Sequence, residues 1–378
     1  MVLKKAVLPK GFKACGMACG IKKSGKPDVA LFYSDEPAKS SHQFTSNSIQ
    51  AAPIKLSKEH IKKNKYFRAI MVNSGNANCF TGAQGYRDAK ETAVSLARSL
   101  GIKPGAVLVS STGIIGKRLP LEKIKAAIPA LVKGLSVKGI DKAKQAIMTT
   151  DTFAKEITAR FTIGGRTVTI CGVAKGAGMI APTMATMLCF ILTDARITQR
   201  ALDKALRVAV GNSFNCITVD GCMSTNDTVS VLANAASGCP LIDSGRHFAE
   251  FLQALKEVCL GLAKLIIRDA EGATKFIRIT VDKAKSFAEA KKIALTIANS
   301  NLFKTAMFAS SPNCIGRIVA SVGASGAGVK QEQLKIKHSP LDKKEVDINV
   351  SIGRGSCRAV IYTSDLTYEY VKINAEYN

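Results

Sequence analysis

The stretch from Lys175 to Leu192 constrains the fold more than any other part of the sequence. It is apolar and approaches the length of a membrane span, but residues such as Gly178, Pro182 and Thr186 interrupt it. These interruptions favour a buried strand with a flanking loop over a transmembrane helix. The composition agrees with a globular protein, since 47% of the residues are hydrophobic and 22% are charged.

A chain of 378 residues predicts two or three folding units with an ample core. Apolar spacing predicts helices over 86–100, 121–133, 139–148, 198–211, 245–267 and 284–299, and strands over 28–33, 68–73, 107–111, 275–281, 346–351 and 357–363. This mixed order predicts an α/β protein in which helices cover sheets. The N-terminus lacks the apolar core of a signal peptide, so we expect a cytoplasmic protein with no membrane span.

Composition also raises a rival function. The formal net charge of +26 is compatible with nucleic-acid binding. The lysines are spread along the chain, however, aromatic residues make up only 6%, and there is no tryptophan, which disfavours that function. The eleven cysteines and four histidines lack the spacing of a zinc site or a disulfide framework, so we expect reduced thiols and no metal.

Two glycine-rich strings and one acidic string are weaker candidates for a site. Gly176–Gly178 and Gly323–Gly328 match no nucleotide-binding motif, so we expect tight turns or close backbone approaches there. Asp220–Asp227 carries oxygen ligands without the spacing of a calcium loop. We expect an Asx-rich turn whose side chains bond to backbone groups. A structural role at the edge of an active site is the alternative.

Thr186 is the strongest candidate for a nucleophile. It follows the small residue Ala185 in the apolar stretch, with Thr183 and Thr193 nearby in the sequence. A hydroxyl there needs a base, and no histidine lies close in sequence; if the chain cuts itself before Thr186, the new α-amino group titrates near pH 8 and can serve. A core threonine bonded to a backbone carbonyl is the commoner arrangement, and that alternative stays open at this point.

Acyl transfer at Thr186 would need two further kinds of group. Thr112 and Gly113 follow a predicted strand and offer a hydroxyl and an unobstructed backbone N–H for an oxyanion hole. An amino-acid substrate also needs charged partners. Lys175 can hold a carboxylate and Glu271 an ammonium group.

Several ordered motifs together resemble one known family. They are Met71–Asn78, Ser111–Gly116, Thr149–Thr152, Ala174–Pro182, Met184–Leu188, Thr218–Gly221, Ser224–Thr228 and Glu271–Lys275, with Pro9–Phe12 and Tyr370–Tyr377 near the two ends. The set resembles the ornithine acetyltransferase (glutamate N-acetyltransferase) family of arginine biosynthesis. The resemblance extends over essentially the whole sequence.

The resemblance implies a layered α-β-β-α sandwich and a precursor that cleaves itself between Ala185 and Thr186. The products would be an α chain of residues 1–185 and a β chain of residues 186–378, assembled as a heterotetramer of two α and two β chains. Thr186 would take acetyl from N2-acetylornithine, release ornithine and pass the acetyl group to glutamate. Two alternatives stay open: a bifunctional enzyme that also uses acetyl-CoA, and a related self-processing amidase or aminopeptidase.

The family's functional positions map onto residues of this sequence. The oxyanion positions correspond to Thr112 and Gly113, as the residues themselves suggest. Substrate contacts correspond to one threonine of the 149–152 run, for which we favour Thr150, and to Lys175, Thr186, Glu271 and Asn374. The resemblance implies no metal and no prosthetic group.

This sequence departs from the family pattern in two places. Family chains commonly continue to a Ser or Thr five residues beyond the position of Asn374, whereas this sequence ends at Asn378. We expect that substrate contact to be absent or supplied by another group. Ser310–Ile318 replaces a string that in the family commonly contains acidic and tryptophan residues, so we expect altered substrate affinity with the nucleophile retained.

Overall fold

A computed structural model describes residues 1–181 and 187–376, and it divides the chain into two compact units. Unit 1 contains Met1–Gly176, Thr186–Ser213 and Ser224–Leu262, and unit 2 contains Ala177–Ala185, Phe214–Met223 and Ala263–Asn378. Two units agree with the predicted two or three. Each unit draws on residues from both sides of the predicted cleavage site between Ala185 and Thr186.

The described strands of unit 1 form one continuous hydrogen-bonded path. Its order is β1 (Val2–Leu3), β6 (Lys155–Ile163), β7 (Arg166–Lys175), β8 (Leu188–Thr193), β9 (Thr228–Ala233), β3 (Val29–Phe44), β4 (Phe67–Asn76) and β5 (Val107–Ile114), with β2 (Phe12–Met17) also paired to β3. The pairs β8–β9 and β4–β5 are parallel and the other pairs are antiparallel. β8 is buried along its whole length, as predicted for the apolar stretch.

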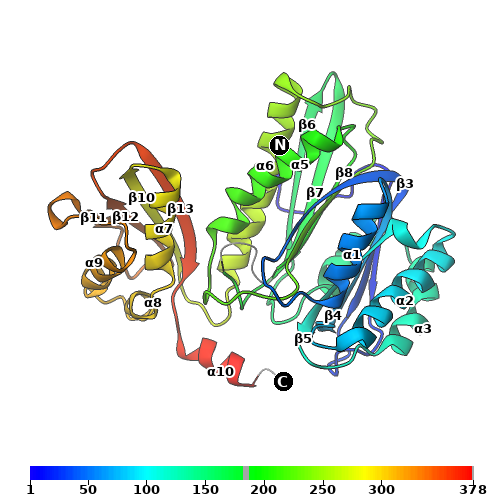
Figure 1. Cartoon of the computed structure of the whole chain (residues 1–378), viewed down its shortest axis with the longest axis horizontal. Helices are drawn as coiled ribbons and strands as arrows, with labels where there is room; N and C mark the ends of the chain where they lie inside the picture. The colour runs from blue at the N-terminus through cyan, green and yellow to red at the C-terminus, as the bar shows by residue number, and fades with distance from the viewer. Residues whose placement is uncertain (182–186, 377–378) are drawn as a thin grey trace. The chain divides into compact units, whose positions relative to one another are not determined.

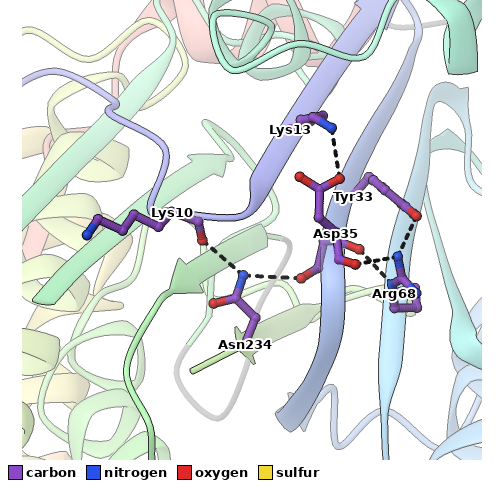
Figure 2. A network of polar contacts seen from close by, with 7 residues as sticks. Lys10, Lys13, Tyr33, Asp35, Arg68 and Asn234 are labelled. Atoms are coloured by element: carbon purple, nitrogen blue, oxygen red, sulfur yellow. Dashed lines mark hydrogen bonds and ion pairs between the residues drawn. The ribbon is translucent and has the colours of Figure 1, made fainter. Parts of the chain in front are cut away.

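The long strand β3 changes partners part-way along, and this divides the path into two sheets. Its first half pairs with β2 and β4, and Lys39–Phe44 pair with β9, with a register shift between Tyr33 and Ala38. At the shift, Arg68 donates from Nη2 to the Tyr33 hydroxyl at 2.6 Å and to the Asp35 carbonyl at 2.7 Å, as Figure 2 shows. These bonds satisfy backbone and side-chain groups that the irregular pairing leaves available.

The same shift is tied to segments on both sides. Lys13 Nζ lies 2.8 Å from Asp35 Oδ1, and Asn234 Nδ2 donates to the Lys10 carbonyl at 3.0 Å and to Ser34 Oγ at 3.3 Å (Figure 2). The Lys13–Asp35 ion pair is about two-fifths exposed, so its contribution to stability is small.

The two sheets of unit 1 pack face to face, with helices on their outer faces. Alternate residues make the inner core, in which the rings of Phe32 and Phe190 lie 5.2 Å apart. The opposite residues of β4 and β5 pack against α1 (Ala52–Lys63), α2 (Gly82–Leu100) and α3 (Leu121–Lys133).

On the other sheet, α6 (Gly245–Arg268) covers β6 and β7, where Phe251 meets Phe161, and α5 (Gln199–Gly211) packs along β3 (Figure 1). α4 (Ile140–Ala146) packs into the inner core. The predicted α-β-β-α sandwich is therefore confirmed.

Unit 2 is a smaller α/β layer pair. Its sheet has the order β11 (Lys335–His338), β12 (Glu345–Ser351), β10 (Phe276–Ala284) and β13 (Cys357–Ser364), with β10 and β12 parallel. α7 (Phe287–Ala298), α8 (Asn301–Phe308) and α9 (Cys314–Ala324) pack on one face around Ile279 and Phe303. α10 (Tyr368–Glu376) follows β13. Short 3₁₀ turns occupy Phe214–Cys216 and Gln331–Gln333 in this unit and Pro104–Ala106 in unit 1.

The predicted elements are present, with shifted boundaries. The helix predicted over 284–299 begins at Phe287, because β10 continues to Ala284 and the Ser286 hydroxyl caps the helix by accepting from Glu289 N. In the second glycine string, Gly326 and Gly328 have the positive φ of the predicted turn, whereas Gly323 lies inside α9, so the prediction is wrong at Gly323 alone. Among the described residues, no helix has the length and apolarity needed to cross a membrane.

Candidate active site

The predicted site residues fall into two groups, one in each unit. Thr112, Gly113, Thr150 and Lys175 belong to unit 1, and Glu271 and Asn374 belong to unit 2. Ala185 and Thr186, the predicted cleavage site and nucleophile, lie outside the described residues.

The predicted oxyanion residues lie within the last residues of β5, which continues to Ile114 and pairs there with β4, rather than after the strand as predicted. Thr112 is 5% exposed, and Gly113 has a φ of +132°. A Cβ at Gly113 would lie 2.4 Å from the carbonyl carbon of Gly75 on β4, so only glycine fits between these backbones. The close approach of β4 therefore requires a glycine at this position.

A network of asparagine side chains, which was not predicted, supports this end of β5. Ser111 Oγ donates to Asn73 Oδ1 at 2.6 Å, and Asn73 Nδ2 donates to the Asn76 carbonyl at 2.8 Å. Asn226 Nδ2 donates to the carbonyls of Ser111 at 2.8 Å and Ala77 at 2.7 Å. Asn226 therefore holds the backbone just before Thr112, and Asn73 of the Met71–Asn78 motif holds the Ser111 side chain.

Lys175 lies beside the predicted oxyanion threonine. It is the last residue of β7 and only 3% exposed, and its Nζ donates to Thr112 Oγ1 at 3.4 Å. Its backbone pairs with Leu188 of β8, two residues beyond Thr186 in the sequence. The structure therefore brings together two residues that the sequence analysis assigned to separate roles.

Asp151 is the main residue that the sequence analysis missed. Its buried carboxylate accepts Lys155 Nζ at 2.6 Å and Gly176 N at 2.7 Å through Oδ1, and Thr149 N at 2.9 Å through Oδ2. Burial opposes ionisation here, but the charges of Lys175 and Lys155 and the Gly176 hydrogen bond outweigh it and hold the pKa of Asp151 well below its usual range. The half-buried Thr150 adjoins this anion in the chain.

A cavity of about 520 Å³ opens beside Asp151 within unit 1. Lys22 and Lys26 line it from the β2–β3 connection, Gln145 lines it from α4, and the α4–β6 connection contributes Met148, Thr149, Thr152 and Phe153. Burial lowers the pKa of Lys22 to about 8, with the positive charge of Lys175 acting in the same direction and the carboxylates of Asp28 and Asp151 opposing it. The cavity is large enough for an amino acid and carries positive charge.

Asp227 is a second buried carboxyl in unit 1. Its Oδ1 accepts Met187 N at 2.8 Å, and Oδ2 has no hydrogen-bond partner in the described part of the chain. Burial raises the pKa of Asp227 well above its usual range, because the Met187 hydrogen bond and the charge of Lys175 offset only part of the desolvation. With Asn226, it confirms that the Asp220–Asp227 string bonds to backbone groups.

In unit 2, Glu271 and Asn374 contact each other directly. Asn374 Nδ2 on α10 donates to Glu271 Oε2 at 2.8 Å. A Cβ on Gly178 would lie 2.1 Å from the same carboxylate oxygen, so Gly178 permits a close backbone approach, as predicted. An accessible carboxylate held by an amide is a suitable partner for an ammonium group.

Each unit by itself offers groups to a charged ligand. In unit 1, Lys175 and Thr112 offer donors to a negative charge, and in unit 2, Glu271 offers an acceptor to a positive one. Within residues 1–181 and 187–376, no cluster of three or more His, Cys, Asp or Glu side chains is placed to bind a metal ion. All eleven cysteines carry free thiols.

Comparison with known proteins identifies the family. Residues 13–378 match the ArgJ family. The chain belongs to the ArgJ family. The resemblance inferred from the sequence motifs is therefore confirmed.

Individual members of the ArgJ family are similar over their full lengths. The arginine biosynthesis bifunctional protein ArgJ of Geobacter sulfurreducens is 46% identical over 97% of this chain and 99% of its own. The protein of the same name from Syntrophotalea carbinolica is 44% identical over 97% of this chain and 98% of its own.

Among solved structures, ArgJ of Bacillus halodurans is 36% identical, with a TM-score of 0.46 over 50% of this chain and 98% of that one. The ornithine acetyltransferase of Mycobacterium tuberculosis, solved with ornithine, is 35% identical, with a TM-score of 0.44 over 48% of this chain and 97% of that one. For this ArgJ family member, the structure gives the burial and hydrogen-bond partners of the described site residues, and their catalytic roles stay predictions.

Proposed function

We propose that this chain moves an acetyl group from N2-acetylornithine to glutamate through an acetyl ester on Thr186. Membership in the ArgJ family confirms the sequence-based assignment to acetyl transfer in arginine biosynthesis. The observation that carries the site assignment is the buried contact between Lys175 Nζ and Thr112 Oγ1, because it joins a cation to the predicted oxyanion hole.

Maturation comes first in this proposal. The hydroxyl of Thr186 attacks the carbonyl carbon of Ala185, the C–N bond breaks, and the departing nitrogen takes up a proton to become the α-amine of Thr186. Water then hydrolyses the resulting ester, which frees the hydroxyl and leaves a carboxylate on Ala185. The fragments are then 1–185 and 186–378.

Turnover repeats this acyl chemistry on a substrate. The α-amine of Thr186 takes the hydroxyl proton as the oxygen attacks the acetyl carbonyl, and the protonated amine returns it to the departing α-amine of ornithine. In this proposal, Thr112 and Gly113 stabilise the oxyanion, and Lys175 holds a substrate carboxylate. Glu271 and Asn374 hold a substrate ammonium group, and Thr150 makes a further substrate contact. Attack by the amine of glutamate on the acetyl ester completes the cycle.

A second acetyl donor is supported by a specific observation. The ArgJ proteins of Geobacter sulfurreducens and Syntrophotalea carbinolica carry the name bifunctional. We propose that this chain likewise makes N-acetylglutamate from glutamate and acetyl-CoA, so that acetyl-CoA is a second acetyl donor. The proposal includes no metal or prosthetic group, a cytoplasmic location, and a heterotetramer of two copies of each fragment.

Intact mass and N-terminal sequencing of purified protein test this proposal. We expect two fragments, the second beginning Thr186-Met-Leu-Cys, and loss of both cleavage and acetyl transfer in Thr186→Ala. Thr186→Ser is the matched control, because it keeps the hydroxyl and should still be cut. An uncleaved but fully active Thr186→Ala would refute the mechanism, and release of free acetate without glutamate would instead indicate an amidase.

A further inference from the structure

The carboxylate of Asp220 binds donors from three separate segments of unit 2. Oδ2 accepts Met179 N at 2.6 Å and the Tyr370 hydroxyl at 3.1 Å, and Oδ1 accepts Ile180 N at 2.9 Å and Cys222 N at 3.0 Å. A half-buried carboxylate with this many donors is strongly fixed in position. Asp220 therefore joins the segment that precedes the predicted cleavage site to the C-terminal helix α10.

The segment 177–181 is held by its backbone as well. The Ile180 carbonyl accepts the Thr218 hydroxyl at 3.1 Å and Val219 N at 2.9 Å, so both polar backbone groups of Ile180 are bonded. Met179 has a φ of +55°, which is uncommon for a residue with a side chain and is held here by the hydrogen bond from its N–H to Asp220.

This segment supports the carboxylate of Glu271, which we expect to bind a substrate ammonium group. Glu271 N donates to the Ala177 carbonyl at 3.0 Å, and Gly178 lies so close to the Glu271 carboxylate that a Cβ would overlap it. The backbone of residues 177–180 therefore determines where the Glu271 carboxylate can lie.

Helix α10 supplies the other half of the arrangement. Thr367 Oγ1 donates to the Gly272 carbonyl at 2.7 Å, and one turn beyond Tyr370 the amide of Asn374 reaches Glu271. Burial, reinforced by the charge of Asp220, raises the pKa of the Tyr370 hydroxyl, which therefore remains a donor. The Tyr370–Asp220 bond thus fixes α10 against segment 177–180.

We propose that Asp220 is a positioning residue that holds segment 177–180 and helix α10 together, so that Glu271 and Asn374 present one carboxylate–amide site for a substrate ammonium group. This inference rests on the proposed function for the identity of the substrate. It assigns a role in substrate binding to residues that the cleavage would leave on the first fragment. Gly178 is then a specificity-determining position, because any side chain there displaces the carboxylate.

The sharpest test removes one hydrogen bond at a time. Tyr370→Phe keeps the ring and loses only the hydroxyl, and Tyr368→Phe is the matched control because Tyr368 is 84% exposed on the same helix. We expect Tyr370→Phe to raise KM for N2-acetylornithine roughly tenfold, with kcat within about twofold and with unchanged Tm and cleavage. Tyr368→Phe should match the wild type.

Gly178→Ala tests the close approach, with Gly316→Ala as its control. Nothing lies within 4 Å of a Cβ at Gly316, which is exposed on α9 of the same unit. We expect Gly178→Ala to weaken ornithine binding by roughly tenfold or more and Gly316→Ala to leave it unchanged. Asp220→Asn should weaken ornithine binding and also slow cleavage. The asparagine amide nitrogen cannot accept hydrogen bonds, whereas both carboxylate oxygens of Asp220 do.

Ornithine titration by calorimetry keeps this test separate from acetyl transfer. If the wild type binds ornithine but transfers no acetyl group, the proposed function fails while the dissociation constants still decide the positioning role. Equal KM and equal ornithine affinity in Tyr370→Phe and the wild type would overturn the inference. A fall in kcat at constant KM would overturn it too, and so would a wild type that binds no ornithine.

Discussion

Unit 1 encloses the charged groups that we expect to act on the substrate, whereas unit 2 leaves its counterparts accessible. Lys175 is 3% exposed, and both partners of the Asp151–Lys155 ion pair have fully buried side chains. Asn374 is exposed and Glu271 is half-buried. Burial strengthens electrostatic interactions by lowering the local dielectric, and it makes each unpaired charge costly.

The comparison separates two tasks. Groups that stabilise a developing negative charge benefit from a fixed, water-poor setting, which the strand ends of unit 1 provide around Thr112 and Lys175. A group that must admit and release an amino acid benefits from access, and its position is then set by hydrogen bonds such as those of Asp220. We therefore expect substitutions in unit 1 to change folding and catalysis together, and those at Glu271 or Asn374 to change mainly binding.

The largest expected effect is that of Asp151→Ala. The substitution removes the carboxylate from a buried lysine and leaves Gly176 N without this acceptor, which should cost about 3–5 kcal/mol of stability. Denaturant unfolding measures the loss, and hydrogen exchange should locate it in β6 and β7. Asp35→Ala, which breaks the partly exposed pair with Lys13, is the control and should cost no more than about 1 kcal/mol. Equal losses of stability in Asp151→Ala and Asp35→Ala would show that burial does not strengthen the ion pair.

Lys175→Ala should have the next largest effect. Loss of a buried cation beside Thr112 should lower kcat/KM for N2-acetylornithine more than tenfold, or about 1.4 kcal/mol and above. Lys90→Ala, at an exposed position on α2, is the control and should leave kcat/KM unchanged. An unchanged kcat/KM in Lys175→Ala would remove this residue from the site.

The sequence predicted the parts of the fold whose signals are local. The helix over 121–133 matches α3 in both bounds, and the apolar run after Thr186 is the buried strand β8. The β6–β7 hairpin was not predicted, although Gly164 and Gly165 carry the positive φ of a two-residue turn. Its strands mix charged and apolar residues, so alternation alone is weak there.

The site shows a similar limit. Lys175, Thr112 and Gly113 could be proposed from residue type, but the importance of Asp151 could not, because an acid four residues before a lysine is usually a solvated pair. The division into units could not be predicted either, since residues 177–181 join unit 2 through contacts with positions such as Asp220 and Glu271 that are distant in sequence. Local patterns carry no record of such long-range contacts.

The last effect is a pH dependence at Lys304, a buried lysine of unit 2 that we place outside the substrate site. Its Nζ donates to Thr363 Oγ1 at 3.0 Å, and burial lowers its pKa to about 7 against the opposing charges of Asp365 and Asp220. Between about pH 7 and pH 10 the unfolded chain holds the proton that the folded chain has lost. The free energy of unfolding should therefore rise with pH there, by at most about 1.4 kcal/mol per unit.

Lys304→Met should remove the contribution of Lys304 to this rise, so that the stability difference between wild type and variant grows in favour of the wild type from pH 7 to pH 9.5. Exposed Lys335→Met is the control and should leave the slope unchanged. Lys22 of unit 1 provides the comparison between units, because its pKa is lowered only to about 8 and the corresponding rise should begin about one pH unit higher. If Lys304→Met and the wild type had parallel pH profiles, Lys304 would keep its charge in the fold, and unit 2 would enclose a cation as unit 1 does.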